Sequence, residues 1–179
     1  MDEHELINAL KKKDSKAFKI VHDLYYAKLK SLSYGIVHNS EDAEDIVQEV
    51  FIDLYDAIGR FREESKLSTW LHKITLNKSY NFLRAKKVRN IFTQLENKLL
   101  QHADKIEDED LETQKINDLH KAIEQLPERQ AKVFTLFYYE NMSQKEIAEI
   151  LNLKSVSVVE QLVFRAKQNI KKRMPNEYN

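Results

Sequence analysis

Glycine and proline, the residues that most often interrupt regular structure, are nearly missing from this chain. There are two of each among 179 residues, against average usage of roughly 7% for glycine and 5% for proline. The chain is instead rich in Leu, Ile, Glu, Lys and Gln, which form helices well. This composition predicts an almost wholly α-helical protein.

Other bulk properties narrow the class further. The chain has no Cys, which excludes disulfides, thiol catalysis and Cys-ligated zinc. The formal charge is zero, with 29 basic and 29 acidic residues, so no overall field favours nucleic acid. The start, MDEHELINALKKKD, has no apolar core of signal-peptide length. No apolar run approaches the ~20 residues of a membrane span. We therefore expect a cytoplasmic protein.

Apolar residues at steps of three and four predict a domain of four helices over residues 1–90. These helices are expected from Asp2 or Glu3 to Lys12, from the caps Asp14 and Ser15 to Ile36, from the caps Asn39 and Ser40 to about Gly59, and from the cap Ser68 to about Val88. Residues 91–112 are acidic, polar and weakly periodic, which is typical of a flexible linker. A second helical domain is expected over residues 113–179. The predicted fold class is all-α, with two small helical domains joined by a linker.

The second domain contains the pattern of a helix-turn-helix at SQKEIAEILNLKSVSVVEQLVFRAKQNIKKR (143–173). Ser143 and Glu146 form a capping box for the first helix, and Asn152 suits the turn because Asn tolerates positive φ. The second helix should start near Ser155 or Ser157. Its expected core positions are Val156, Val159, Val163, Ala166 and Ile170, and its outward positions are Ser157, Val158, Gln161, Arg165 and Gln168. The basic end suits phosphate, although a plain helical hairpin with a solvated basic end remains an alternative.

The first domain places an acidic helix directly before a basic segment. From 39 to 56 there are seven carboxylates and no Lys or Arg, whereas 60–90 has nine Lys or Arg and two Glu. One apolar stripe of the acidic helix is predicted to face the core: Ala43, Ile46, Val47, Val50, Phe51 and Leu54. The acidic side is either a solvated face or a surface for a basic partner.

The basic segment combines cations, amides and aromatic residues. Steps of three and four place Lys73, Asn77, Lys78, Asn81 and Arg84 on much of one side of its helix. The preceding loop carries Phe61, Arg62, Ser65 and Lys66. An aromatic wall with a few polar groups is typical of single-strand recognition. A solvated lysine-rich face is the alternative, and Trp70 is interpreted as a core residue.

Several motifs together resemble the extracytoplasmic-function (ECF) group of the sigma-70 family, the bacterial transcription initiation factors. They are DAEDIVQEVFIDLY, then F-R-x-x-S-K-L-S-T-W-L-x-x-I-x-x-N-x-x-x-N-x-L-R, then L-P-E-R-Q-x-x-V-F, then S-x-x-E-I-A-E-I-L and F-R-A-K. The resemblance covers nearly the whole chain, in the family's order. It implies a factor that binds core RNA polymerase and directs it to promoters.

The resemblance also assigns a partner to each surface. The acidic helix would dock on the β′ coiled coil of the polymerase through Asp45, Gln48, Glu49 and Asp53. The first domain, sigma region 2, would capture a flipped base and grip −10 DNA through Phe61, Arg62, Ser65, Lys66, Lys73, Asn77, Lys78, Asn81, Arg84 and Lys87. The second, region 4, would lie near the β flap and read the −35 element through Lys145, Ser155, Ser157, Val158, Gln161, Arg165 and Lys167. The linker would thread the polymerase and fix neither domain strongly in the free state. An anti-sigma factor is a further implied partner.

The recognition helix departs from the family pattern at its start. Val158, Glu160, Gln161 and Leu162 stand where Thr, Lys, Ser and Arg are often found in the family. Glu160 faces DNA poorly when unpaired, although Glu can accept a hydrogen bond from cytosine N4. Gln161 and Arg165 are therefore the favoured candidates for base or phosphate contact.

Two other classes of protein compete with this interpretation. A helix-turn-helix regulator would use region 4 alone, but it has no need for the acidic helix, the loop and the basic helix together. A metal-dependent enzyme is suggested by six His and 29 acids, yet none forms H-E-x-x-H or another tight ligand set. We expect no catalytic residue, no metal, no cofactor and no small-molecule substrate.

Overall fold

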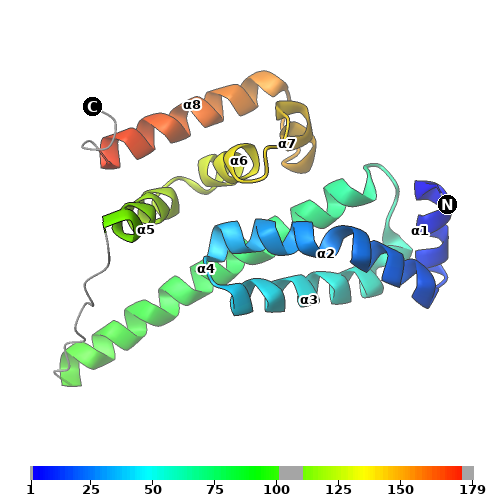
Figure 1. Ribbon diagram of the computed structural model, residues 1–179, viewed down its shortest axis with the longest axis horizontal. Coiled ribbons are helices and arrows are strands. Elements are labelled where there is room, and N and C mark those ends of the chain that lie inside the picture. Colours follow the sequence, from blue (N-terminus) through cyan, green and yellow to red (C-terminus); the bar gives the residue numbers. More distant parts are fainter. Residues whose placement is uncertain (1, 101–110, 175–179) are drawn as a thin grey trace.

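The computed structural model describes residues 2–100 and 111–174, and these parts are built from helices (Figure 1). The α-helices are α1 (Glu3–Lys11), α2 (Ser15–Val37), α3 (Ser40–Ala57), α4 (Leu67–Leu100), α5 (Leu111–Glu124), α6 (Glu128–Tyr138), α7 (Gln144–Ile150) and α8 (Val156–Arg173), with a short 3₁₀ helix η1 (Ile58–Arg60) after α3. The prediction of an all-α fold is confirmed. No helix in the described parts of the chain is both long and apolar enough to cross a membrane.

Helices α1 to α4 form the first domain, in which α2, α3 and α4 pack against one another (Figure 1). The caps follow the sequence closely: Asp2 makes a capping box with Glu5, and Asp14 and Asn39 cap α2 and α3. The predicted stripe of α3 is buried, except for Phe51, which is half-buried against the same core. This core also includes α1 residues, because α1 buries three apolar side chains: Leu6, Ile7 and Leu10.

The ends of α4 differ from the predicted ends. The helix begins at Leu67, so Ser68 lies in its first turn and is not its cap. The reason is tertiary: the backbone N–H of Leu67 donates to the Glu3 carboxylate of α1, at 2.8 Å. At the other end α4 continues to Leu100, and α5 begins at Leu111. The segment 91–112 predicted as a linker thus includes helical residues at both ends, and its part 101–110 lies outside the described residues.

The second domain has the expected helix-turn-helix, formed by α7 and α8. Ser143 and Glu146 make the predicted capping box, and Asn152 adopts the predicted positive φ, 51°. Ser155 is the N-cap of α8, so Ser157 lies inside the helix. The prediction that Val156 faces the core is wrong, since 39% of it is exposed. Val156 is the first residue of α8, whereas the buried face of the helix starts at Val159.

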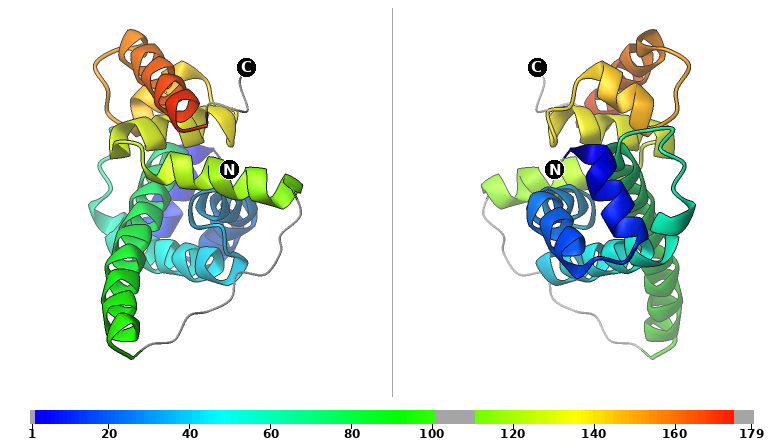
Figure 2. Two further views of the ribbon diagram at one scale, coloured as in Figure 1. Left: turned by 90° about the vertical axis from the view of Figure 1, so that its left-hand side faces the viewer. Right: turned by 90° about the vertical axis from the view of Figure 1, so that its right-hand side faces the viewer.

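The two domains share an apolar core, which the resemblance did not imply. Leu32, Ile36 and Leu76 of the first domain belong to the same buried cluster as Val133 and Leu136 of α6. The hydroxyls of Tyr80 and Thr135 are hydrogen-bonded across this boundary at 3.2 Å, and burial raises the pKa of Tyr80. Figure 2 shows the second domain packed over α2 and α4. In this structure, therefore, the domains are closed against one another.

Candidate nucleic-acid and protein interfaces

The exposed side of α3 carries acids together with large apolar side chains. Three of the predicted polymerase-binding residues are exposed there: Asp45, Gln48 and Glu49. Ile52 and Tyr55 lie on the same helix and are 61% and 49% exposed. Sequence reasoning missed these two, although Ile52 falls outside the apolar stripe of α3 and so signals an outward position. Exposed apolar groups among charges are typical of a protein-binding surface.

Several acids of α3 are already paired within the molecule. Lys78 of α4 contacts Glu49 at 3.0 Å and Asp53 at 3.1 Å. Burial alone would lower the pKa of Lys78, but these two carboxylates outweigh burial and raise it. Lys78, predicted as a DNA contact, is therefore bound to the acidic helix in this structure. Among the described residues, Asp45 forms no ion pair.

The loop between η1 and α4 exposes three of its four predicted DNA contacts, namely Arg62, Ser65 and Lys66. Phe61 is half-buried and packs against Trp70, with ring centroids 5.3 Å apart. Trp70 is itself half-buried against the core of the first domain, as its interpretation as a core residue implies. The loop thus presents polar groups beside an aromatic wall.

The basic side of α4 carries the other predicted −10 residues, of which Lys73, Asn77, Asn81, Arg84 and Lys87 are exposed. Helix α6 reaches this side at two points. Lys132 donates to the Asn77 side-chain oxygen at 2.9 Å, and Glu128 pairs with Arg84 at 3.6 Å. The closed arrangement therefore places region 4 against the surface predicted to grip DNA. No sequence pattern indicated this contact.

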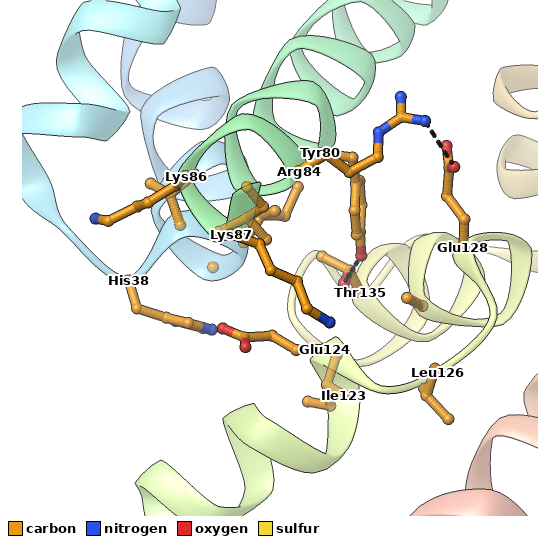
Figure 3. A pocket seen from close by; sticks show the side chains of 15 residues that line it. His38, Tyr80, Arg84, Lys86, Lys87, Ile123, Glu124, Leu126, Glu128 and Thr135 are labelled. Carbon is orange, nitrogen blue, oxygen red and sulfur yellow. Dashed lines mark hydrogen bonds and ion pairs between the residues drawn. The ribbon is translucent and has the colours of Figure 1, made fainter. Parts of the chain in front are cut away.

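A cavity of about 590 Å³ lies between the end of α2, the middle of α4 and the start of α6 (Figure 3). Its lining includes Arg84, Lys86 and Lys87 of α4 as well as apolar groups from both domains. At its edge the rings of His38 and His120 are stacked, with centroids 3.4 Å apart. Burial, with His120 adding to it, lowers the pKa of His38 to about 4. In the described residues, no group of three or more His, Cys, Asp or Glu is arranged to hold a metal ion.

The outer side of the helix-turn-helix exposes most of the predicted −35 residues. Lys145, Ser155, Ser157, Gln161, Arg165 and Lys167 are exposed, and Val158 is half-buried. Lys167 lies over the Tyr138 ring, 5.1 Å from its centroid. Sequence reasoning missed Phe164, which is 62% exposed on α8 between Gln161 and Arg165. The signal was its position next to the buried Val163, off the inner face.

Comparison with known proteins gives each domain a counterpart. The family model described as Sigma-70 region 2 matches residues 21–89, and that of Sigma-70, region 4 matches residues 116–170. RNA polymerase sigma-H factor of Pseudomonas aeruginosa is 30% identical, over 96% of this chain and 93% of the relative. ECF RNA polymerase sigma factor SigW of Bacillus subtilis is 31% identical, over 94% of each chain.

Solved structures show the same fold at lower identity. CnrH, in complex with the cytosolic domain of CnrY, is similar with a TM-score of 0.68 and 20% identity, over 97% of both chains. The sigma factor RpoE of Bartonella quintana, in complex with the anti-sigma factor NepR, has a TM-score of 0.59 and 22% identity. That likeness covers 90% of this chain and 98% of RpoE.

The fold and its surfaces define a two-domain α-helical protein with a helix-turn-helix and a separate acidic helix. The chain belongs to the sigma-70 family of RNA polymerase sigma factors, in its ECF group. It is a transcription initiation factor that binds core RNA polymerase and directs it to promoters through the −10 and −35 elements. Sigma factors are not enzymes, so its surfaces serve binding alone.

Proposed function

We propose that the exposed side of α3 is the surface that docks on the β′ coiled coil of core polymerase. The observation that carries this assignment is the mixture of exposed acids with Ile52 and Tyr55, which are 61% and 49% exposed. Carboxylates complement a basic partner and speed its approach, while apolar groups contribute affinity once they are buried. Asp45 is the acid best suited to this role, because it is exposed and forms no ion pair with any described residue.

The loop 61–66 and the basic side of α4 would bind the melted −10 strand. Melting costs a few kcal/mol for each unstacked step, so a captured base must recover that energy from contacts in the loop. The half-buried Phe61 and Trp70 pair offers the aromatic wall, and Arg62, Ser65 and Lys66 are exposed beside it. Lys73, Asn77, Asn81, Arg84 and Lys87 would follow the strand along α4. Lys78 would join them only after leaving Glu49 and Asp53.

Helix α8 would enter the major groove at the −35 element. Gln161 and Arg165 are exposed and carry groups that hydrogen-bond to base edges or phosphate. Phe164 adds a large apolar group that suits contact with a thymine methyl. Region 4 would also contact the β flap, and the segment 91–112 would connect the two domains inside the holoenzyme.

An anti-sigma factor is a further expected partner, since the sigma factor of Bartonella quintana was solved bound to one. The protein would act in the bacterial cytoplasm, where the polymerase works. Family membership supports these roles, and we assign them to particular residues of this chain.

The deciding experiment is a titration of the protein against bacterial core polymerase at several salt concentrations. Each complex is then used for run-off transcription on genomic fragments. For Asp45→Lys we expect an affinity for core at least about tenfold lower, because the new charge faces a basic surface. Added salt should weaken the wild-type complex by screening the attraction.

Asp118→Lys on α5 is the matched control, since it reverses an exposed charge in the other domain. It should bind core as the wild type does, and circular dichroism should show equal helicity for all three proteins. Unchanged core affinity of Asp45→Lys would remove α3 from the interface. A wild-type protein that ignored core but bound duplex DNA would favour the helix-turn-helix regulator.

A further inference from the structure

Helix α1 lies outside the part of the chain that matches the region 2 family model, which starts at residue 21. It is nevertheless fixed firmly to the first domain. Its buried side chains Leu6, Ile7 and Leu10 belong to the same cluster as Ile58 and Leu67, which flank the loop 61–66. Figure 2 shows α1 packed across the end of the first domain. Helix α1 therefore lies next to the loop that is proposed to bind the −10 strand.

Glu63, in the middle of the loop, is held by two side chains of α1. One carboxylate oxygen accepts from Lys11 Nζ at 2.6 Å, and the other lies 2.8 Å from His4 Nδ1. Lys11, and to a smaller extent His4, hold the pKa of Glu63 below its ordinary value. The partners are 52 and 59 residues away in sequence, so these contacts are tertiary. They attach the centre of the loop to α1.

The end of the loop is attached to the same helix. The Glu3 carboxylate accepts the backbone N–H of Leu67 at 2.8 Å. That N–H belongs to the first turn of α4, where the helix offers no partner of its own. A carboxylate is also favourable at this positive end of the helix dipole. Helix α1 therefore holds the loop at two points.

The backbone at the held point has an uncommon conformation. Glu63 has φ of 59°, in the left-handed region that residues other than glycine seldom adopt. Such a conformation persists only where the surroundings enforce it. With Glu63 turned towards α1, its neighbours Arg62 and Glu64 are exposed, and so are Ser65 and Lys66. The loop is thus shaped before any nucleic acid binds.

We infer that α1 is the positioning element of the base-capture loop, with Lys11, His4 and Glu3 as positioning residues that act through Glu63 and the Leu67 amide. The inference rests on the proposed −10 function and deepens it. A loop ordered in advance does not lose conformational entropy when a base enters, so more of the contact energy offsets melting. None of the three residues needs to touch DNA.

The packing of the loop against the first domain can be followed by intrinsic tryptophan fluorescence. Trp70 is the single tryptophan, and it packs against Phe61 of the loop. Quenching of its fluorescence by acrylamide therefore reports how firmly the loop covers it. Lys11→Met and Glu63→Gln should increase quenching. Lys12→Met removes an exposed charge from the neighbouring residue, and should leave quenching unchanged.

The second measurement is binding of wild-type and variant holoenzymes to a fluorescent single-stranded −10 oligonucleotide, taken from a promoter that run-off transcription identifies. Lys11→Met and Glu63→Gln should each lower this affinity about five- to tenfold. Core affinity and melting temperature should hardly change, since a partly exposed ion pair such as Lys11–Glu63 contributes little to stability. Lys11→Glu combined with Glu63→Lys restores opposite charges and should recover much of the lost affinity. A purely structural role for α1 would not give this pattern.

Quenching and strand affinity equal to wild type in both variants would overturn the inference. So would equal losses in Lys12→Met, since the effect would then come from net charge. A wild-type holoenzyme that transcribes but does not bind the strand would overturn the proposed −10 role of the loop, and the inference with it. The two failures are distinguishable, because the wild-type holoenzyme binds the strand when only the inference fails and does not bind it when the −10 role fails.

Discussion

At the scale of single residues, the stacked His38 and His120 rings form a titratable contact between the domains. Burial lowers the pKa of both residues, and that of His38 falls to about 4. Around them, Glu124 on α5 favours protonation of His120, while Lys86 and Lys87 line the adjacent cavity. Both rings are therefore neutral in the closed structure at neutral pH.

We expect acid to destabilise the closed structure through His38. Its pKa is near 6.5 in the unfolded chain and about 4 here, so stability is lost as pH falls through this interval. His38→Asn removes the titration, and Asn tolerates the φ of 55° at this position. Between pH 7 and pH 5, the melting temperature of the wild type should fall further than that of the variant. Equal acid sensitivity of the two proteins would contradict this expectation.

Glu140 has the opposite effect on the pH dependence of stability. Burial raises the pKa of its carboxyl, and one of its oxygens has no hydrogen-bond partner. Its protonation favours the folded structure, so its contribution to stability grows as pH falls. Comparing the His38→Asn variant with the wild type cancels this term, because both proteins keep Glu140.

At the scale of helices, α8 separates two kinds of DNA contact. Phe164→Ala should lower the ratio of the affinity for a −35 duplex to the affinity for a random duplex about tenfold, because it removes an apolar contact with a base. The salt dependence of DNA binding should not change in this variant. Lys167→Met should weaken binding to both duplexes equally and reduce the salt slope by about one. Affinities measured across a salt series would test both, and a loss of specificity in Lys167→Met would reverse the assignment.

The helices also show how far local sequence determines this fold. The caps at Asp14, Asn39 and Ser143 and the left-handed Asn152 were predictable, because each depends on a few neighbouring residues. The start of α4 was not, since the partner of the Leu67 amide is Glu3 on another helix. The exposure of Asp45, Lys73 and Gln161 followed from helical period alone. The pairing of Lys78 with two acids of α3 did not.

At the scale of the whole molecule, the closed arrangement conflicts with binding at two promoter elements. Elements centred at −10 and −35 are about 25 base pairs apart, or roughly 85 Å along B-DNA. In the closed structure α6 contacts Asn77 and Arg84, which belong to the predicted −10 surface. Because α6 covers part of the predicted −10 surface, we expect the domains to separate before both elements are bound.

A disulfide between the domains would test this separation directly. A Cβ at Gly35 would lie 3.8 Å from the Tyr139 Cβ, close to the usual distance in a disulfide. The chain has no Cys, so Gly35→Cys with Tyr139→Cys gives a single possible bridge. Under oxidising conditions we expect loss of promoter-dependent transcription, and recovery after reduction with dithiothreitol.

Each single Cys variant is the control, because it carries the substitution without the bridge. Non-reducing electrophoresis measures how much of the double variant is bridged. A fully bridged protein that still transcribed as well as its reduced form would show that the domains need not separate.

The apolar core that the two domains share has a thermodynamic consequence for regulation. Promoter binding selects the open fraction of the population, so the apparent dissociation constant rises in inverse proportion to that fraction. Each 1.4 kcal/mol of closure reduces the effective affinity about tenfold. Substitutions in the shared core, at Leu32 or Leu136 for example, would then act as activating mutations. They would strengthen initiation although both side chains are buried and reach neither the polymerase nor DNA.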